Sequence, residues 1–215
     1  MLIRSIAIIG MLFALLGGCA SKKSATEEYN KPAAYWYKEI VQKIAAGNLD
    51  KADDAYTSLA SEHIASPLLK EAMMILYRVH LDEEEYLMAQ FYLDSYIKRY
   101  ATSRNIEYLK YLQIKTHFAQ FKHPKRNQKL LLDTISEAKD YKAKFPRSLY
   151  NPMVDTILTK LYLTELILNR DIVSLYQRLG KKESAKIYQQ KIDQSWLKDT
   201  PIATENQSLF QKILP

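Results

Sequence analysis

The residue with the most distinctive chemistry in this sequence is its single cysteine, Cys19. With no second thiol, no disulfide can form within the chain, but the sulfur can carry a covalently attached group. Cys19 follows a start that holds one charge, Arg4, an apolar run from Ser5 to Leu16, and two glycines. This order is typical of a secretory signal peptide, and the run is shorter than the roughly 20 apolar residues that span a bilayer. We therefore predict a signal peptide over residues 1–18.

The residues around the cysteine add a more specific indication. Leu16-Gly17-Gly18-Cys19 resembles the bacterial lipobox, in which small residues let a peptidase reach the backbone before a cysteine that is acylated through sulfur. The resemblance implies lipidation at Cys19, and Ala20, where aspartate would signal inner-membrane retention, implies the periplasmic face of the outer membrane. An uncleaved N-terminal anchor is the alternative. Residues 19–32 are mostly polar and are interpreted as the lipidated cysteine and a flexible tether.

Other groups capable of chemistry are scattered along the chain. The four histidines occupy separate segments, and none pairs with another at metal-ligand spacing. The sequence has no glycine-rich phosphate loop and no nucleophile elbow. The carboxylates of Asp53-Asp54 and Asp82–Glu85 are interpreted as solvated helix starts. We therefore predict no catalytic residue, no metal site and no cofactor.

The composition favours an all-helical protein. The chain is 47% hydrophobic and 26% charged, with 5 glycines and 7 prolines, and Gly10, Gly17 and Gly18 belong to the predicted signal peptide. An all-β chain of this length would need more turn residues. The net charge of +7 indicates an anionic membrane surface, an acidic partner domain or no particular partner, and no nucleic-acid partner is expected for an exported chain.

Apolar residues recur at helical spacing through most of the mature chain, between breaks such as Gly47-Asn48, Pro67 and Pro146. They predict about four antiparallel helix pairs over residues 33–198, with Asp50 capping the second helix, Asn151 capping a long helix, and Gly180 ending that helix in the left-handed conformation. Residues 199–215 are predicted as a C-terminal tail. The apolar residues near its end fit either a frayed terminus or a short docking segment.

The pairs carry a repeated pattern. Trp36, Gly47 and Ala52 match the tetratricopeptide arrangement of an early aromatic, a glycine at the break and an alanine at the tightest helix crossing. Ala89 follows Ala52 at close to the roughly 34-residue period, and Gly180 and Ala185 repeat the Gly47–Ala52 offset. We predict a tetratricopeptide-like α-solenoid. An unrelated helical bundle is the alternative.

Together with the lipobox, three segments of this array resemble the BamD family of outer-membrane protein assembly lipoproteins, also called ComL or YfiO. These segments are Tyr35 to Ala60, Asn105 to Tyr111, and Phe145 to Tyr150 with the following helix to Gly180. The chain departs from the family at its C-terminal end. A fifth repeat is absent or replaced by residues 199–215, and Ile187-Tyr188 stands where the family often has Asn-Arg.

The resemblance implies a non-catalytic scaffold. Its expected partners are the periplasmic domains of the BamA-type β-barrel insertase, unfolded outer-membrane proteins, and the membrane through the N-terminal lipid. The open alternative is a tetratricopeptide lipoprotein for pilus assembly or cell-wall remodelling. First helices of such arrays line the concave, binding face. The candidate partner-binding residues are Tyr37, Lys38, Tyr77, Tyr108, Lys110, Tyr111 and Arg178, although tyrosines also serve as packing between helices.

Replacing Cys19 tests the first of these predictions. We expect Cys19→Ser to abolish acylation and to move the protein from the membrane fraction to the soluble fraction, while partner binding by the helical array is retained. Fractionation and intact-mass measurement report the two effects. Acylation that persists in Cys19→Ser would contradict the assignment of the anchor.

Overall fold

The computed structural model describes residues 29–121 and 127–200, so the predicted signal peptide, Cys19, the segment 122–126 and most of the predicted tail lie outside the described residues. The described residues form helices and turns, with no strand among them. The helices are α2 (Ala33–Ala45), α3 (Leu49–Glu62), α4 (Pro67–Asp82), α5 (Tyr86–Tyr100), α6 (Ile106–Ala119), α7 (Gln128–Lys144), α8 (Asn151–Arg178) and α9 (Lys182–Asp193).

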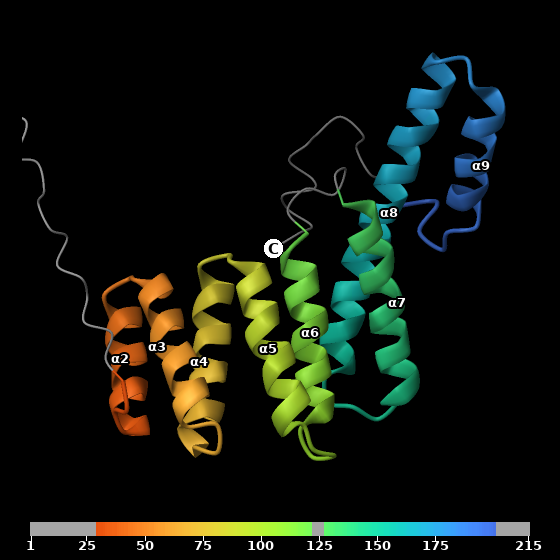
Figure 1. The fold of residues 1–215 in the computed structure, drawn as a ribbon. Helices are drawn as coiled ribbons and strands as arrows, with labels where there is room; N and C mark the ends of the chain where they lie inside the picture. The colour runs from red at the N-terminus through yellow and green to blue at the C-terminus, as the bar shows by residue number, and fades with distance from the viewer. Residues whose placement is uncertain (1–28, 122–126, 201–215) are drawn as a thin grey trace, which may run out of the picture. The chain divides into compact units, whose positions relative to one another are not determined.

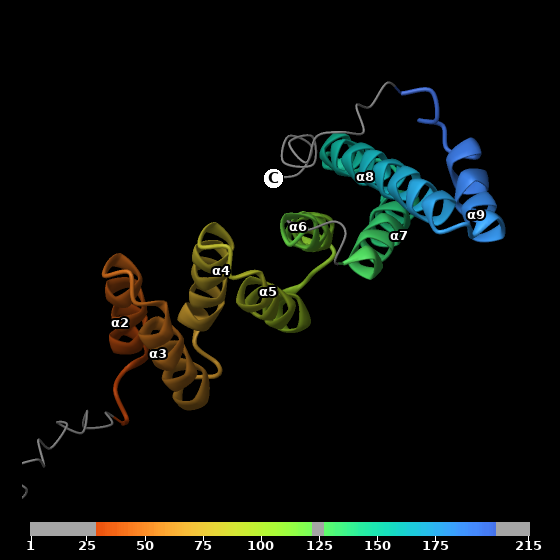
Figure 2. The same cartoon turned by 90° about the horizontal axis from the view of Figure 1, so that it is seen from above.

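From Ala33 onward the chain forms one compact unit in which each helix packs against the next (Figures 1 and 2). Consecutive helices run in opposite directions, which gives the pairs α2–α3, α4–α5, α6–α7 and α8–α9. The first helices also contact one another, α2 with α4 and α6 with α8. The predicted all-α, tetratricopeptide-like array is confirmed.

Three of the four pairs share one turn geometry. Gly47, Glu84 and Gly180 all have positive φ, at 68°, 62° and 70°. In each turn the next backbone N–H donates to the carbonyl five residues earlier, as in Asn48 to Lys43 at 2.9 Å and Glu85 to His80 at 2.8 Å. This is the Schellman motif, which satisfies carbonyls at the end of a helix. The left-handed end predicted at Gly180 is confirmed, and a glutamate takes the same position in the second pair.

Each of these turns leads into a small residue at the helix contact. Ala52, Ala89 and Ala185 follow Gly47, Glu84 and Gly180 by the same interval, and all three are buried. Two backbones approach closely only where the intervening side chain is small, so the shared spacing fixes both the turn and the crossing of each pair.

Two predicted caps are wrong. Asn48, not Asp50, caps α3, because its side chain accepts the Lys51 N–H at 3.2 Å. Asn151 is the first residue of α8 rather than its cap, and its amide instead donates to the Phe145 carbonyl at 3.0 Å. Helix α3 thus begins one residue before Asp50, and helix α8 begins at Asn151 itself.

The core is divided into three clusters along the array. The first cluster extends from Trp36 to Leu112 and contains buried residues of the five helices α2, α3, α4, α5 and α6. The second extends from Ile114 to Leu168 and contains buried residues of α6, α7 and α8. The third, which includes Leu166 and Ile192, lies between the C-terminal half of α8 and α9. Helix α8, with 28 residues, therefore belongs to two clusters.

The glutamate in the left-handed turn gives a prediction about stability. A non-glycine residue in this conformation is strained by roughly 1–2 kcal/mol, whereas glycine gives up about 0.5–1 kcal/mol of extra chain entropy on folding. We expect Glu84→Gly to raise the free energy of unfolding by up to about 1 kcal/mol. Urea unfolding followed by circular dichroism measures the change.

Gly47→Ala is the matched comparison. An added Cβ would meet nothing within 4 Å at Gly47, so the substitution introduces only backbone strain. We expect it to lower the free energy of unfolding by about 1 kcal/mol. A destabilisation by Glu84→Gly as large as that of Gly47→Ala would contradict this explanation of the turns.

Candidate partner-binding surface

Aromatic side chains of α4, of α6 and of the residue before α8 lie close to one another. Tyr111 stacks on Tyr150 with ring centroids 5.2 Å apart and planes 8° from parallel, and Tyr108 lies 5.4 Å from the same ring. Tyr77 is 2% exposed, and its hydroxyl hydrogen-bonds to Thr116 Oγ1 at 3.1 Å. Below, Tyr77, Tyr108, Tyr111 and Tyr150 are called the tyrosine cluster.

The members of the tyrosine cluster differ in what they can contact. Burial, assisted by the neighbouring Tyr108 and Tyr111 phenols, raises the pKa of Tyr77, and burial likewise raises the pKa of Tyr111. Tyr77 and Tyr111 are therefore neutral hydrogen-bonding groups at physiological pH. Tyr77 is a core residue and is not accessible to a partner. Tyr108, Tyr111 and Tyr150 are half-buried and present part of each ring to solvent.

The remaining candidates from the sequence lie elsewhere. Tyr37 packs against the first core cluster from α2, and its neighbour Lys38 is exposed. Arg178 is the last residue of α8 and lines a cavity of about 330 Å³. Tyr77, Tyr108 and Tyr111 are thus brought together, and Tyr37, Lys38, Lys110 and Arg178 are not part of their cluster. Tyr150 was not among the candidates, because nothing in its local sequence signals that it stacks on α6.

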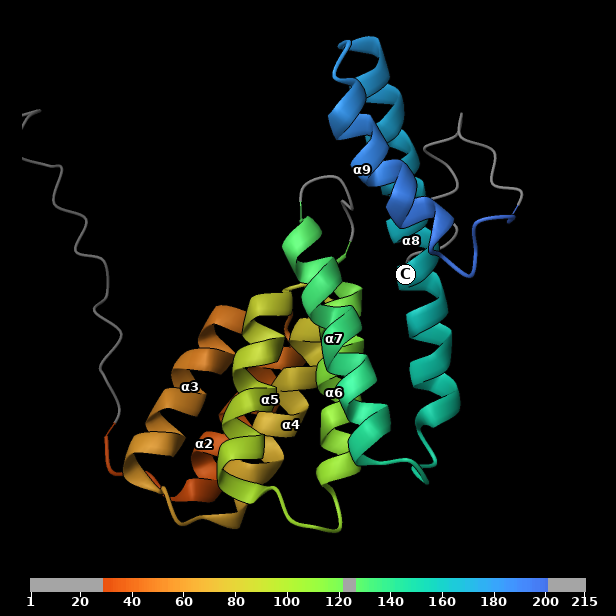
Figure 3. The ribbon, with the colours of Figure 1, turned by 90° about the vertical axis from the view of Figure 1, so that its right-hand side faces the viewer.

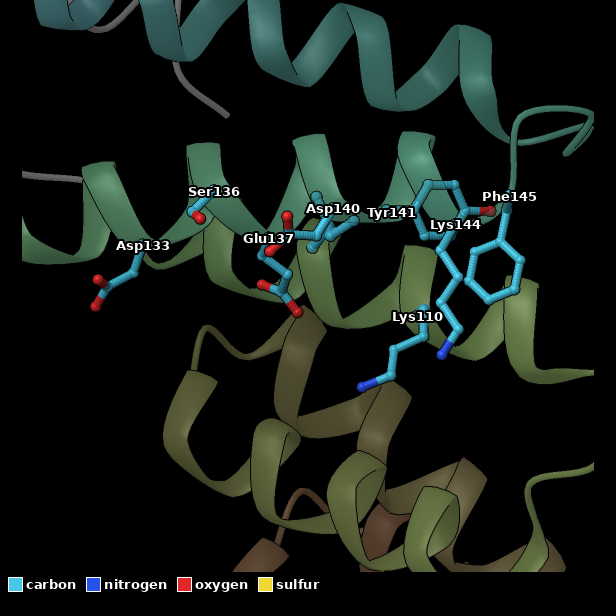
Figure 4. Close-up of a pocket in the computed structure, with 9 residues that line it drawn as sticks. Lys110, Asp133, Ser136, Glu137, Asp140, Tyr141, Lys144 and Phe145 are labelled. Atoms are coloured by element: carbon cyan, nitrogen blue, oxygen red, sulfur yellow. The ribbon is translucent and has the colours of Figure 1, made fainter.

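Lys110 faces a different groove from the tyrosines. It lines a pocket of about 410 Å³ between α6 and α7, with Ile114 and Phe145 as apolar lining and acidic side chains contributed by α7 (Figure 4). Its ammonium donates to Gln113 Oε1 at 2.7 Å, and the Gln113 amide donates to Asp94 of α5 at 2.5 Å. Lys110 is therefore held within a polar network that joins α5 to α6.

An ionic cluster centred on one buried histidine joins the first two helix pairs. The ring of His80, only 1% exposed, has Nε2 3.0 Å from Asp53 Oδ1 on α3 and Nδ1 2.6 Å from Glu85 Oε2 before α5. Tyr92 stacks on this ring and donates its hydroxyl to Asp53 at 2.6 Å. For Asp53 the interpretation as a solvated helix start is wrong, because its side chain is 22% exposed and bound within this cluster. Glu85 lies directly before α5 with half of its side chain exposed, as that interpretation expects, and also contacts His80.

The geometry fixes the charge of His80. Ionised carboxylates only accept hydrogen bonds, so both ring nitrogens donate only when the ring is protonated. Burial opposes the charged ring, but the hydrogen bonds to Asp53 and Glu85 outweigh it and raise the pKa of His80 above its ordinary 6.5. His117 is in a similar position, because its 2.6 Å hydrogen bond to Glu137 of α7 outweighs burial and raises its pKa.

The described part of the chain holds no group of three or more metal-ligating side chains that could bind an ion. Within the same residues, none of the helices combines the length and the apolar character that a membrane crossing requires. The described array consists of packed helix pairs with aromatic and charged side chains on their surfaces. This arrangement is typical of helical-repeat binding proteins.

Comparison with known proteins identifies the family. Residues 29–185 match the family model of YfiO, described as outer membrane lipoprotein. The chain is also 39% identical, over 198 residues, to the outer membrane protein assembly factor BamD of Helicobacter pylori; the match covers 92% of this chain and 90% of that protein. The chain belongs to the YfiO family of outer membrane lipoproteins, so the resemblance found in the sequence is confirmed.

The protonated state of His80 predicts how stability depends on pH. Because the folded-state pKa is raised, the contribution of His80 is complete below the unfolded-state pKa of about 6.5 and is lost as the pH rises through the folded-state value. We expect the difference in unfolding free energy between the unmodified protein and His80→Gln to be largest near pH 6 and to shrink toward pH 9. Urea unfolding across this range measures it.

Tyr92→Phe serves as the control. It removes one hydrogen bond to Asp53 but leaves both bonds of the His80 ring, so it should destabilise the protein by about 1 kcal/mol without altering the pH dependence. A His80→Gln difference that stays constant between pH 6 and pH 9 would show that the ring is not protonated.

Proposed function

We propose that this chain is a non-catalytic scaffold in the assembly of outer membrane proteins, and that it binds the periplasmic domains of the β-barrel insertase. The name of its Helicobacter pylori relative and the family of outer membrane lipoproteins support the role in assembly. In such a scaffold the lipid on Cys19 provides the attachment to the membrane, and the helical array provides the binding.

The observation that carries the binding role is the tyrosine cluster. Half-buried tyrosines offer large apolar faces with hydroxyls at the edge, and such residues often dominate the binding energy of protein interfaces. Their rings are already ordered by stacking between α6 and the start of α8, so little side-chain entropy is lost when a partner binds. The proposed occupant of this surface is an extended segment of the insertase or of an unfolded outer-membrane protein.

Two half-buried members of the cluster, Tyr108 and Tyr111, pack against the core without being among its buried residues. We expect Tyr108→Ala combined with Tyr111→Ala to weaken partner binding by about tenfold or more, as loss of interface anchors commonly does. Co-purification of the insertase from detergent-extracted membranes gives a first measurement, and titration with its isolated periplasmic domains gives the affinity. Depletion of the protein should also lower the levels of outer-membrane β-barrels.

Tyr100→Ala is the matched control, because Tyr100 is also half-buried and paired with another tyrosine, Tyr96, but belongs to α5. It should leave binding unchanged. Equal losses in the control and in the double variant would remove the tyrosine cluster as the binding surface. Normal β-barrel levels after depletion, accompanied by loss of pili or septation defects, would instead favour the alternative lipoprotein role.

A further inference from the structure

The three turns that connect one helix pair to the next lie along a single edge of the array. They span residues 63–66, 101–105 and 145–150, and they lie at the bottom of the array in Figures 1 and 3. Helix α2 begins at the same edge, at Ala33, so the chain enters the array there. The described turns within the pairs lie at the opposite edge. Below, the edge formed by the three connecting turns is called the inter-pair edge.

Apolar side chains protrude from two of the three turns. Leu149 is 86% exposed in the turn between α7 and α8, and Ile64 is 64% exposed in the turn between α3 and α4. A single exposed apolar side chain is common on protein surfaces. These two stand on separate turns of one edge, an arrangement that suits insertion into a continuous soft surface.

The charges around these apolar side chains are mainly positive. The three turns contain no aspartate or glutamate, and they expose Arg104 and Arg147. The helix ends that adjoin the turns add four exposed cations, which are Lys70, Lys98, Arg99 and Lys144. The same helix ends hold the carboxylates of Glu62 and Glu107. Glu62 accepts a hydrogen bond from the Trp36 indole at 2.8 Å, and Glu107 is half-buried.

The opposite edge of the first two pairs has the reverse charge. Asp50 lies in the first turn of α3, and four consecutive carboxylates, from Asp82 to Glu85, end α4 and lead into α5. An anionic surface would attract the inter-pair edge and repel this acidic edge, so the charge distribution favours one orientation of the array. A protein of an outer membrane lipoprotein family has such a surface close at hand.

We propose that the inter-pair edge lies against an anionic lipid bilayer, with Arg104 and Arg147 at the phosphate headgroups and Leu149 and Ile64 inserted among them. The cations supply an attraction that salt screens, and the apolar side chains add binding that depends on the area they bury. The contact is separate from the proposed contact with the insertase, because none of these four residues belongs to the tyrosine cluster.

Sedimentation with lipid vesicles tests the proposal. The protein used is the chain from residue 19 onward with Cys19→Ser, which cannot be acylated at that position. It should bind vesicles of phosphatidylcholine that contain about one third phosphatidylglycerol, and it should not bind vesicles of phosphatidylcholine alone. Arg147→Glu combined with Leu149→Glu should lower the binding constant for the anionic vesicles at least about tenfold.

Leu179→Glu combined with Lys181→Glu is the matched control. It also replaces one exposed leucine and one exposed cation, but in the turn between α8 and α9 at the opposite edge. It should leave vesicle binding within about twofold of the unmodified chain, and circular dichroism should show that both variants remain folded. Equal losses in the two variants would overturn the proposal, as would equal binding of the unmodified chain to both kinds of vesicle or to neither.

A fluorescent label provides a second measurement. With Cys19 replaced, Leu149→Cys introduces the only thiol in the chain. A bimane label on this thiol should shift its emission to shorter wavelength when anionic vesicles are added, whereas the same label on Leu179→Cys should not. An unshifted label at position 149 would contradict the proposal.

Titration with the isolated periplasmic domains of the insertase, without lipid, separates this contact from the proposed function. Arg147→Glu with Leu149→Glu should leave that affinity unchanged. If this variant instead lost the insertase domains and kept its binding to vesicles, the inter-pair edge would be a protein interface and the proposal would be wrong.

Discussion

Three of the four helix pairs depend on how closely their two helices approach one another. The chain must reverse direction within a few residues, which requires one backbone in the left-handed conformation, and the helices must then cross where a side chain is almost absent. Both requirements are met at one fixed spacing, by Gly47 with Ala52, by Glu84 with Ala89 and by Gly180 with Ala185. The aromatic and charged side chains that give the surfaces their character are placed by these crossings.

Local features of the fold could be predicted from the sequence because they arise within a few residues. The glycines at 47 and 180 mark left-handed turns, and the periodic apolar residues mark helices whose buried faces the structure confirms. Glu84 escaped prediction because nothing in a glutamate signals positive φ, and the conformation there is set by the hydrogen bonds of the turn. The cap at Asp50 failed because the neighbouring Asn48 took the same role. The cap at Asn151 failed because its side chain instead donates to the Phe145 carbonyl, a contact outside the helix.

Contacts between pairs could not be predicted in the same way. The hydrogen bonds of His80 to Asp53 on a preceding helix and of Tyr77 to Thr116 on a following one join residues far apart in sequence. No periodicity encodes them. For this reason Tyr77 was expected on a binding surface but lies in the core, and Tyr150 was missed although it completes the aromatic stack. The family resemblance, by contrast, rested on short segments and was confirmed by comparison of whole chains.

Helix α8 has a mechanical consequence for the C-terminal half of the array. It contains no glycine or proline between Met153 and Arg178. Its first half packs in the second core cluster, through residues such as Leu161, and its second half packs in the third, through residues such as Val173. Helices bend sharply mainly at glycine, proline or local bulges, so α8 acts as a stiff lever about 40 Å long. A tilt of about 10° about the start of α8 displaces its far end, and α9 with it, by about 7 Å. Small rearrangements around the aromatic stack at the start of α8 are thereby converted into larger displacements at the opposite end of the helix.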